Sequence, residues 1–230
     1  KMVQAYDHRA ASVTVNPENL HRPAQPMPVT EAQHGDPEWL PEPQYWVSLE
    51  KVRESFPGDW AVGFKDVTAP TNVRTMIASV LPLAGFGNTL PLMLPANALP
   101  TTDLTLLIAN LNCLAYDYCA RQKVQGQHLN WFIVEQLPLI DPQRYQDTLG
   151  PGIVADLIRR EVLHLTYTAH DMAAFARDLG YDGPPFAWNL EDRRHRMARL
   201  DALFFRLYGL DRDDAAYILN LDDRLGSIES

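Results

Sequence analysis

The chain opens with a region in which the hydrophobic positions follow no regular period. Residues 1–45 are rich in proline, which restricts the backbone and removes amide donors. The prolines are Pro17, Pro23, Pro26, Pro28, Pro37, Pro41 and Pro43, and the large aromatic residues are Tyr6, Trp39, Tyr45 and Trp46. Because these aromatic side chains are too apolar for a freely solvated linker, we expect an extended arm that crosses a surface. A disordered linker is the alternative.

Short apolar runs bounded by proline and glycine follow, between Tyr45 and Pro100, and this pattern is typical of short β-strands. The runs cover residues 60–64, 75–81 and 89–94, with the turn-forming residues Gly85, Gly87 and Asn88 between the last two. They predict a small, twisted mixed β-sheet.

Beyond residue 100 the apolar positions recur every three to four residues, which predicts a mainly helical remainder. A strong helix should begin at Thr102 or Asp103, end near Lys123 and be followed by Gly126 as a stop signal. Further helices are predicted over 153–164 and 169–179, from Asn189 to Gly209, and from Asp211 onward. The fold class is therefore α+β. We expect an arm at 1–45, an α/β domain with a central helix at 46–150 and a helical subdomain at 151–230.

The predicted helix after Asn189 carries both an apolar seam and many arginines. The seam, which we expect to be core, consists of Leu190, Met197, Leu200, Leu203, Phe204 and Leu207. The arginines are Arg193, Arg194, Arg196, Arg199 and Arg206, and the acidic residues Glu191, Asp192 and Asp201 alternate with them. This alternation favours a polar face that is solvated or docks onto another domain, rather than a basic stripe.

The charge balance is acidic, with a formal net charge of −9, which argues against a protein that coats DNA without specificity. Residues 71–150 carry four basic and five acidic groups, so DNA would meet least repulsion there. No apolar run approaches the roughly 18 residues of a membrane span, and no signal-peptide pattern follows Lys1. We expect a cytoplasmic piece of a longer protein without a membrane partner. Its two cysteines, Cys113 and Cys119, should remain reduced.

The sequence contains no familiar set of catalytic residues. It lacks a glycine-rich nucleotide loop, a Gly-Lys-Ser/Thr phosphate loop, a His-Glu-x-x-His metal pair and a Gly-x-Ser-x-Gly nucleophile turn. His164 and His170 are six residues apart, which places them on different helix faces and argues against a shared metal. We therefore expect no catalytic residue, metal or cofactor in this chain itself.

Several stretches occur in a characteristic order. They are 1–9 (KMVQAYDHR), 45–47 (YWV), 64–68 (FKDVT), 74–82 (RTMIASVLP), 111–123 (LNCLAYDYCARQK), 126–130 (GQHLN), 136–138 (QLP), 200–210 (LDALFFRLYGL) and 213–219 (DDAAYIL). In this order the chain resembles the C-terminal target-recognition region, a TaqI-like specificity domain, of adenine-specific DNA methyltransferases and Type IIG restriction–modification enzymes. The stretches resemble, in turn, the junction after the catalytic domain, the first strands of the recognition domain, its central helix, loop and following strand, and its closing helices.

This resemblance implies a module that recognises a specific sequence in double-stranded DNA, within a restriction–modification or phage-defence protein. The family's cofactor loop and its Asn-Pro-Pro-Tyr motif are absent from the chain. The resemblance thus implies a methyltransferase domain N-terminal to Lys1, which would bind S-adenosylmethionine and flip the target adenine. It leaves endonuclease activity open. The alternative function is a docking adaptor of a defence complex that reads no bases.

The best candidate for DNA contact is the segment 121–131, which contains no acidic residue. Its amides can pair with adenine, and its cations can contact guanine or phosphate. With residues near strand ends and in the glycine turn, the candidates are Lys65, Arg74, Asn88, Arg121, Lys123, Gln125, Gln127, His128 and Asn130. A polar loop that simply faces water is the alternative for the segment. His8 and Arg9 could also reach the DNA backbone, with a local ion pair to Asp7 as the alternative.

Overall fold

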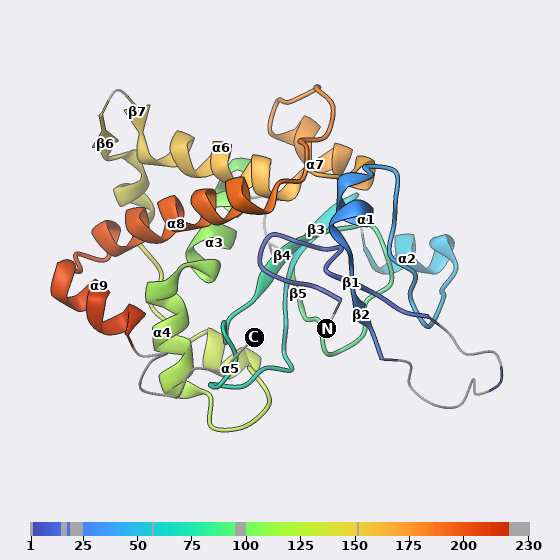
Figure 1. The fold of residues 1–230 in the computed structure, drawn as a ribbon, viewed down its shortest axis with the longest axis horizontal. Helices are drawn as coiled ribbons and strands as arrows, with labels where there is room; N and C mark the ends of the chain where they lie inside the picture. The colour runs from blue at the N-terminus through green and yellow to red at the C-terminus, as the bar shows by residue number, and fades with distance from the viewer. Residues whose placement is uncertain are drawn as a thin grey trace.

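The computed structural model describes residues 2–14, 18, 25–56, 58–94, 100–150 and 152–220. Pro17 and Pro23 of the predicted arm lie outside these residues. The fold is α+β, as predicted, with small sheets and a larger set of helices (Figure 1). No helix within the described ranges is both long and apolar enough to cross a lipid bilayer.

The main sheet has three strands, with β3 (Trp60–Phe64) between β4 (Ala78–Pro82) and β5 (Leu92–Met93). Both pairings are antiparallel, so the prediction of a mixed sheet is wrong for the described residues. The physical reason is that the connections between these strands contain no crossover helix, which a parallel pair requires.

Strand β4 begins three residues later than the predicted run. The backbone N–H groups of Thr75 and Met76 donate to the carboxylate of Asp117, each at 2.7 Å, instead of to a neighbouring strand. The side-chain amide of Asn112 then pairs with both backbone groups of Ala78, the first residue of the strand. Helix side chains therefore decide where this strand starts.

The predicted helix from Thr102 to Lys123 is two helices, α3 (Thr101–Asn112) and α4 (Leu114–Lys123). Cys113, between them, has an extended backbone with ψ of 153°. Its sulfur accepts a hydrogen bond from the Tyr116 N–H, and the Leu114 N–H donates to the buried carboxylate of Asp201. These polar contacts satisfy the start of α4, so the chain can turn between the two helices.

The remaining helices match the sequence prediction in part: those over 131–134 and 142–146 were not predicted, and the predicted helix over 169–179 is a 3-10 turn followed by an α-helix. They are the short α5 (Trp131–Val134), the 3-10 helices η2 (Pro142–Gln146) and η3 (His170–Met172), α6 (Val154–Thr166), α7 (Ala173–Asp178), α8 (Leu190–Leu207) and α9 (Arg212–Leu219). Asn189 caps α8 through its side chain, and Asp211 and Asp214 form a capping box on α9. Gly180 and Gly209 have positive φ after α7 and α8. A two-stranded ribbon, β6 (Thr148–Leu149) with β7 (Gly152–Ile153), precedes α6.

One cluster of buried apolar residues joins the sheet to the helices. It includes Phe64 of β3, Ile108 of α3, Ile158 of α6 and Phe204 of α8. Helix α3 packs on β4 and α6, and α8 packs on α4 and α6 (Figure 1). In the predicted seam of α8, Leu200, Phe204 and Leu207 are buried as expected, whereas Leu190 at the first turn is exposed.

The N-terminal arm contains a two-stranded ribbon, β1 (Ala11–Ser12) with β2 (Met27–Pro28), the short helix α1 (Glu31–Gly35) and extended segments. Helix α2 (Leu49–Ser55) follows it. Tyr6 is buried, as its apolar character predicts, but Tyr45 and Trp46 are 76% and 81% exposed. The aromatic residues of the arm therefore do not all serve to attach it to the surface.

Buried polar side chains attach the start of the arm to the rest of the molecule. The guanidinium of Arg9 is fully buried and donates to the carbonyl oxygens of Asp36, Trp39, His34 and Thr168 at 2.9–3.1 Å. His8 is buried 2.8 Å from the Asp171 carboxylate. The prediction that His8 and Arg9 contact DNA is therefore wrong, because burial removes both from solvent.

The alternative prediction, a local ion pair between Arg9 and Asp7, also differs from the structure. One carboxylate oxygen of Asp7 accepts the backbone N–H of Arg9, and the other lies 3.1 Å from the His34 ring. The nearby His34 and Arg193 contribute to a pKa of Asp7 below its ordinary value, against the effect of burial. Asp7 thus accepts a backbone N–H and contacts the His34 ring, whereas backbone carbonyl groups bind the Arg9 side chain.

Candidate functional site

The polar loop after α4 is held in place by its backbone. Residues 124–130 return to the sheet, where the N–H of Leu129 donates to the Asp66 carbonyl at 2.7 Å. The N–H of Thr68 donates to the Gln127 carbonyl at 3.0 Å, and Val67 and His128 form an antiparallel bridge. The side chain of Leu129 is fully buried. The loop therefore has a defined backbone although it lies outside the sheet.

The glycine-rich turn with Asn88 lies beside this loop, because the N–H of Asp66 donates to the Thr89 carbonyl at 3.1 Å. Asp66 thus connects the two segments through its backbone. Together they expose a set of polar side chains that we call the loop surface: Asn88, Lys123, Gln125, Gln127, His128 and Asn130. Lys65 is half-buried next to Asp66. The structure therefore brings most of the predicted contact residues to one part of the molecule, near α5 (Figure 1).

An acidic residue reduces the positive charge of this surface. The sequence segment 121–131 contains no acid, but Asp66 approaches it from the sheet, and its carboxylate lies 2.7 Å from Nδ1 of His128. The other carboxylate oxygen of Asp66 is buried without a hydrogen-bond partner. The loop surface is therefore rich in amides and poor in free cations.

Two predicted contact residues have structural roles instead. Arg121 binds the buried carboxylate of Asp117 at 2.8 Å and donates to the carbonyl oxygens of Pro70 and Val73. Its side chain joins α4 to the segment that precedes β4. A DNA contact by this largely buried guanidinium would require these bonds to break, so we correct that prediction.

Arg74 is the second such residue. Its guanidinium donates to the Asn112 carbonyl at 3.0 Å and to the Asp201 carboxylate at 2.9 Å. Burial alone would lower the pKa of Arg74, but the carboxylate of Asp201 raises it above its ordinary value. Arg74 therefore carries a permanent charge that joins the segment before β4 to α8, and its guanidinium is largely withdrawn from solvent.

Apolar groups flank the loop surface, and the sequence interpretation gave them no role. Val67 and Trp131 are each 43% exposed and Phe132 is 60% exposed, while the next two residues, Ile133 and Val134, are buried. The Trp131 ring packs edge-on against Phe64, with centroids 5.1 Å apart. Because all four residues of the short helix α5 are apolar, the sequence does not show which of them are exposed. Such side chains can contact sugars or thymine methyl groups beside amides that read base edges.

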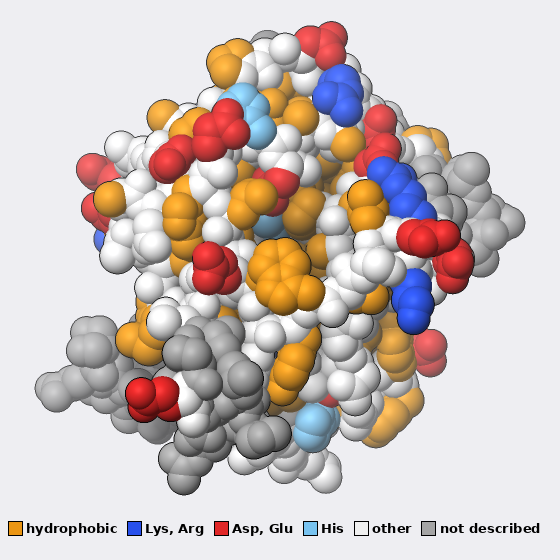
Figure 2. Space-filling model, turned by 90° about the vertical axis from the view of Figure 1, so that its right-hand side faces the viewer, with side chains coloured by type: hydrophobic (Ala, Val, Ile, Leu, Met, Phe, Trp, Pro, Cys, Tyr) orange, Lys and Arg blue, Asp and Glu red, His pale blue; other side chains and the backbone are white. Residues whose placement is uncertain are grey.

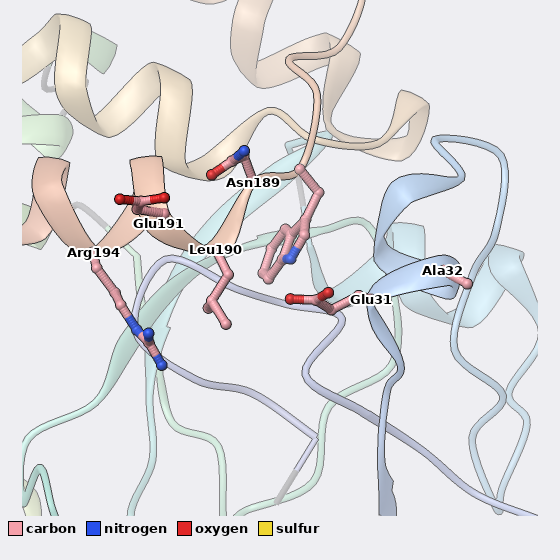
Figure 3. A pocket seen from close by; sticks show the side chains of 7 residues that line it. Glu31, Ala32, Asn189, Leu190, Glu191 and Arg194 are labelled. Carbon is pink, nitrogen blue, oxygen red and sulfur yellow. The ribbon is translucent and has the colours of Figure 1, made fainter.

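A separate cavity of about 570 Å³ lies between α1 and the first turn of α8. Glu31 and Ala32 line one side, and Asn189, Leu190, Glu191 and Arg194 line the other, with Trp188 next to them (Figure 3). The Trp188 ring stacks on His34, with centroids 3.7 Å apart, and Arg193 lies 3.9 Å from its centre. Ring faces occupied in this way leave little aromatic surface for a ligand. None of the predicted contact residues lines this cavity.

Groups suited to other chemistry are scarce in the part of the chain that is described. No group of three His, Cys, Asp or Glu side chains there is arranged to hold a metal ion. Cys113 and Cys119 are free, and burial raises the pKa of Cys113 to about 12, so this thiol is not a nucleophile at neutral pH. No family model matches the chain, and no significant match was found among curated proteins or solved structures.

Proposed function

We propose that the chain recognises specific sequences in double-stranded DNA through the loop surface. In this proposal it is the target-recognition module of an adenine-N6 DNA methyltransferase, and a separate domain of the protein binds S-adenosylmethionine. The observation that carries the proposal is the loop itself, in which the amide and imidazole groups of Gln125, Gln127, His128 and Asn130 are exposed on a backbone held by the sheet.

This arrangement supports base reading for two physical reasons. Amide side chains can both donate to and accept from the edge of a base, and each good pair discriminates by roughly 1–3 kcal/mol. A loop whose backbone is already ordered loses less conformational entropy on binding than a mobile one. Leu129 and the bridge between Val67 and His128 provide that order.

The first test replaces Gln127, His128 and Asn130 by alanine in the full-length protein. We expect the methylated sequence to change, or methylation to be lost, while binding of S-adenosylmethionine persists. The loop backbone should remain in place, because its hydrogen bonds do not use these side chains. Methylome sequencing of cells that carry each variant measures the result. If the variant methylates the same sequence to the same level, the loop does not read DNA.

A matched control replaces exposed residues of similar type elsewhere, namely Gln143, Gln146 and His195. This control should leave the methylated sequence unchanged. Lys123→Gln should behave differently from both triple variants. If Lys123 contacts phosphate, this change weakens binding to all sequences alike and lowers the salt slope by about one unit.

An exposed apolar segment favours the second candidate function, a docking adaptor. Tyr45, Trp46, Val47 and Leu49 are all more than half exposed, in the chain segment that leads into α2. Figure 2 shows this side of the molecule, with apolar side chains spread across it and more acidic than basic groups between them. Exposed aromatic residues are typical anchors of protein interfaces.

The docking function makes a different prediction for a double substitution, Tyr45→Ser with Trp46→Ser. If this segment anchors the chain to a separately purified methyltransferase domain, the double variant should lose that association, which analytical ultracentrifugation measures. Val73→Ser is the control, because Val73 is 78% exposed elsewhere on the surface. Unchanged association of the double variant would exclude this segment as the anchor.

A further inference from the structure

Arginines line one face of α8 along the seam with α6. Arg196, Arg199 and Arg206 are spaced so that they share a helix face with Leu203. Helix α6 packs beside α8 and contributes Arg160 (Figure 1). At a rise of about 1.5 Å per residue, the arginines of α8 extend over about 15 Å.

A buried carboxylate organises the arginines at one end of this seam. Glu161 of α6 is only 6% exposed and lies 2.7 Å from Arg196, 3.4 Å from Arg160 and 3.8 Å from Arg199. The side chains of Arg160 and Arg199 remain 60% and 64% exposed. Since a guanidinium has five N–H donors, these two arginines keep most of their donors for a ligand.

A cavity lies at the other end of this row of arginines. A cavity of about 290 Å³ is lined by Arg144, Asp147, Thr148, Leu149, Val154, Leu203, Arg206 and Leu207. Nε of Arg144 donates to Asp147 at 2.9 Å, which orients this guanidinium beside the ribbon of β6 and β7. We call Arg144, Arg160, Arg196, Arg199 and Arg206 the arginine track.

Of the three acidic residues that alternate with these arginines in the sequence, only Asp192 pairs with one of them, Arg196. Asp201 is buried on another face of α8, where it binds Arg74 and the N–H of Leu114. Glu191 lies at the first turn, beside the cavity near α1. The carboxylates that pair with the track are Asp147, Glu161 and Asp192, so arginines outnumber them. The prediction that this face of α8 is solvated or docks onto another domain used only the alternation of arginines and acidic residues along the sequence.

We infer that the arginine track binds the phosphate backbone of DNA. This inference rests on the proposed function for the identity of its ligand. Arginine is well suited to phosphate because its planar fork donates two parallel hydrogen bonds. The loop surface has few free cations, so it supplies little of the salt-dependent attraction on which DNA binding depends.

An acidic protein surface is the alternative ligand for the arginine track. The scarcity of exposed apolar side chains beside the track argues against this alternative. Protein interfaces usually have an apolar or aromatic centre. Among the described residues, no large apolar side chain of α6 is exposed, and the exposed one on α8 is Leu190, at the end away from Arg206. The track thus provides many charged donors and little apolar surface, as phosphate contacts require.

The test compares two triple variants with the same change in net charge. One replaces Arg160, Arg199 and Arg206 by glutamine and keeps Arg196 to neutralise Glu161. The control replaces Lys51, Arg53 and Arg177, which are exposed outside the track. Binding to a duplex of random sequence is measured by fluorescence anisotropy from 50 to 200 mM salt, after equal melting temperatures show that both variants fold.

We expect the track variant to bind at least tenfold more weakly at the lower salt concentration and to lose about 2–3 units of salt slope. The control variant should keep the wild-type slope. Equal effects of the two variants, or no effect of the track variant, would overturn the inference. The inference would also be overturned if the track variant still bound DNA but no longer bound an acidic protein.

The two proposals fail in distinguishable ways. If the track variant loses random-sequence affinity but the loop triple variant methylates an unchanged sequence, the loop proposal fails and the track remains. If the loop variant changes the methylated sequence and the track variant keeps its salt slope, the track inference alone fails. A wild-type chain that binds no duplex at any salt concentration in this range would overturn the track directly.

Discussion

Arg9→Met is expected to lower the free energy of unfolding by about 3–5 kcal/mol. The guanidinium donates to four carbonyl oxygens from two parts of the chain, residues 34–39 and Thr168, and burial leaves no water to replace it. Hydrogen bonds to a charged group each contribute roughly 1.5–3 kcal/mol, although such contributions do not add fully. Urea denaturation followed by circular dichroism measures the loss.

Two further variants make the Arg9 test specific. Arg53→Met removes an arginine whose ion pair with Asp59 is exposed, so its effect should stay within about 0.5 kcal/mol. Arg9→Lys keeps the charge but loses the planar fork, so it should recover only part of the stability. A value for Arg9→Met as small as that for Arg53→Met would show that these buried hydrogen bonds do not hold the arm.

Asp117→Asn should lower the free energy of unfolding by about 3 kcal/mol. One carboxylate oxygen of Asp117 accepts the N–H groups of Thr75 and Met76, and the other accepts Nε of Arg121. Asparagine can keep the first oxygen, but its amide group would then place a donor against the Arg121 donor. A buried guanidinium would be left without its counter-charge.

Hydrogen exchange provides a local measurement for Asp117→Asn. Exchange should accelerate at Thr75 and Met76 more than in the core of α6, because these two N–H groups depend directly on the carboxylate. Asp103→Asn is the control, since Asp103 is an exposed residue in the first turn of α3. Uniform exchange across the molecule, with stability close to that of the control, would contradict the prediction.

The sequence predicts those parts of the fold that depend on neighbouring residues. The cap at Asn189, the capping box of Asp211 and Asp214, and the positive φ of Gly180 and Gly209 all involve atoms a few positions apart. The break between α3 and α4 does not. It depends on contacts of Asn112 with Ala78 and of Leu114 with Asp201, which the chain pattern does not reveal.

The same distinction explains the outcome at the candidate site. The exposure of Gln125, Gln127 and Asn130 follows from a polar run after a helix, and the structure agrees. Arg74 looked equally free in the sequence, but its partner Asp201 lies 127 positions away. The approach of Asp66 to His128 also required the fold. Charge read along the chain therefore overestimated the cations of the loop, and it could not show which arginines of α8 pair with the acidic residues that alternate with them.

The buried hydrogen bond between Arg9 and Thr168 spans 159 positions of the chain. It makes the arm and the helical part mutually dependent, because neither satisfies its polar groups without the other. After an exchange of residues 46–220 between related chains, the position of the carbonyl that meets this guanidinium would depend on the helical part of another chain. Recombination should therefore tolerate a junction before Tyr6 better than one at the end of the arm. Recombination should be best tolerated when Arg9 and Thr168 come from the same parent chain.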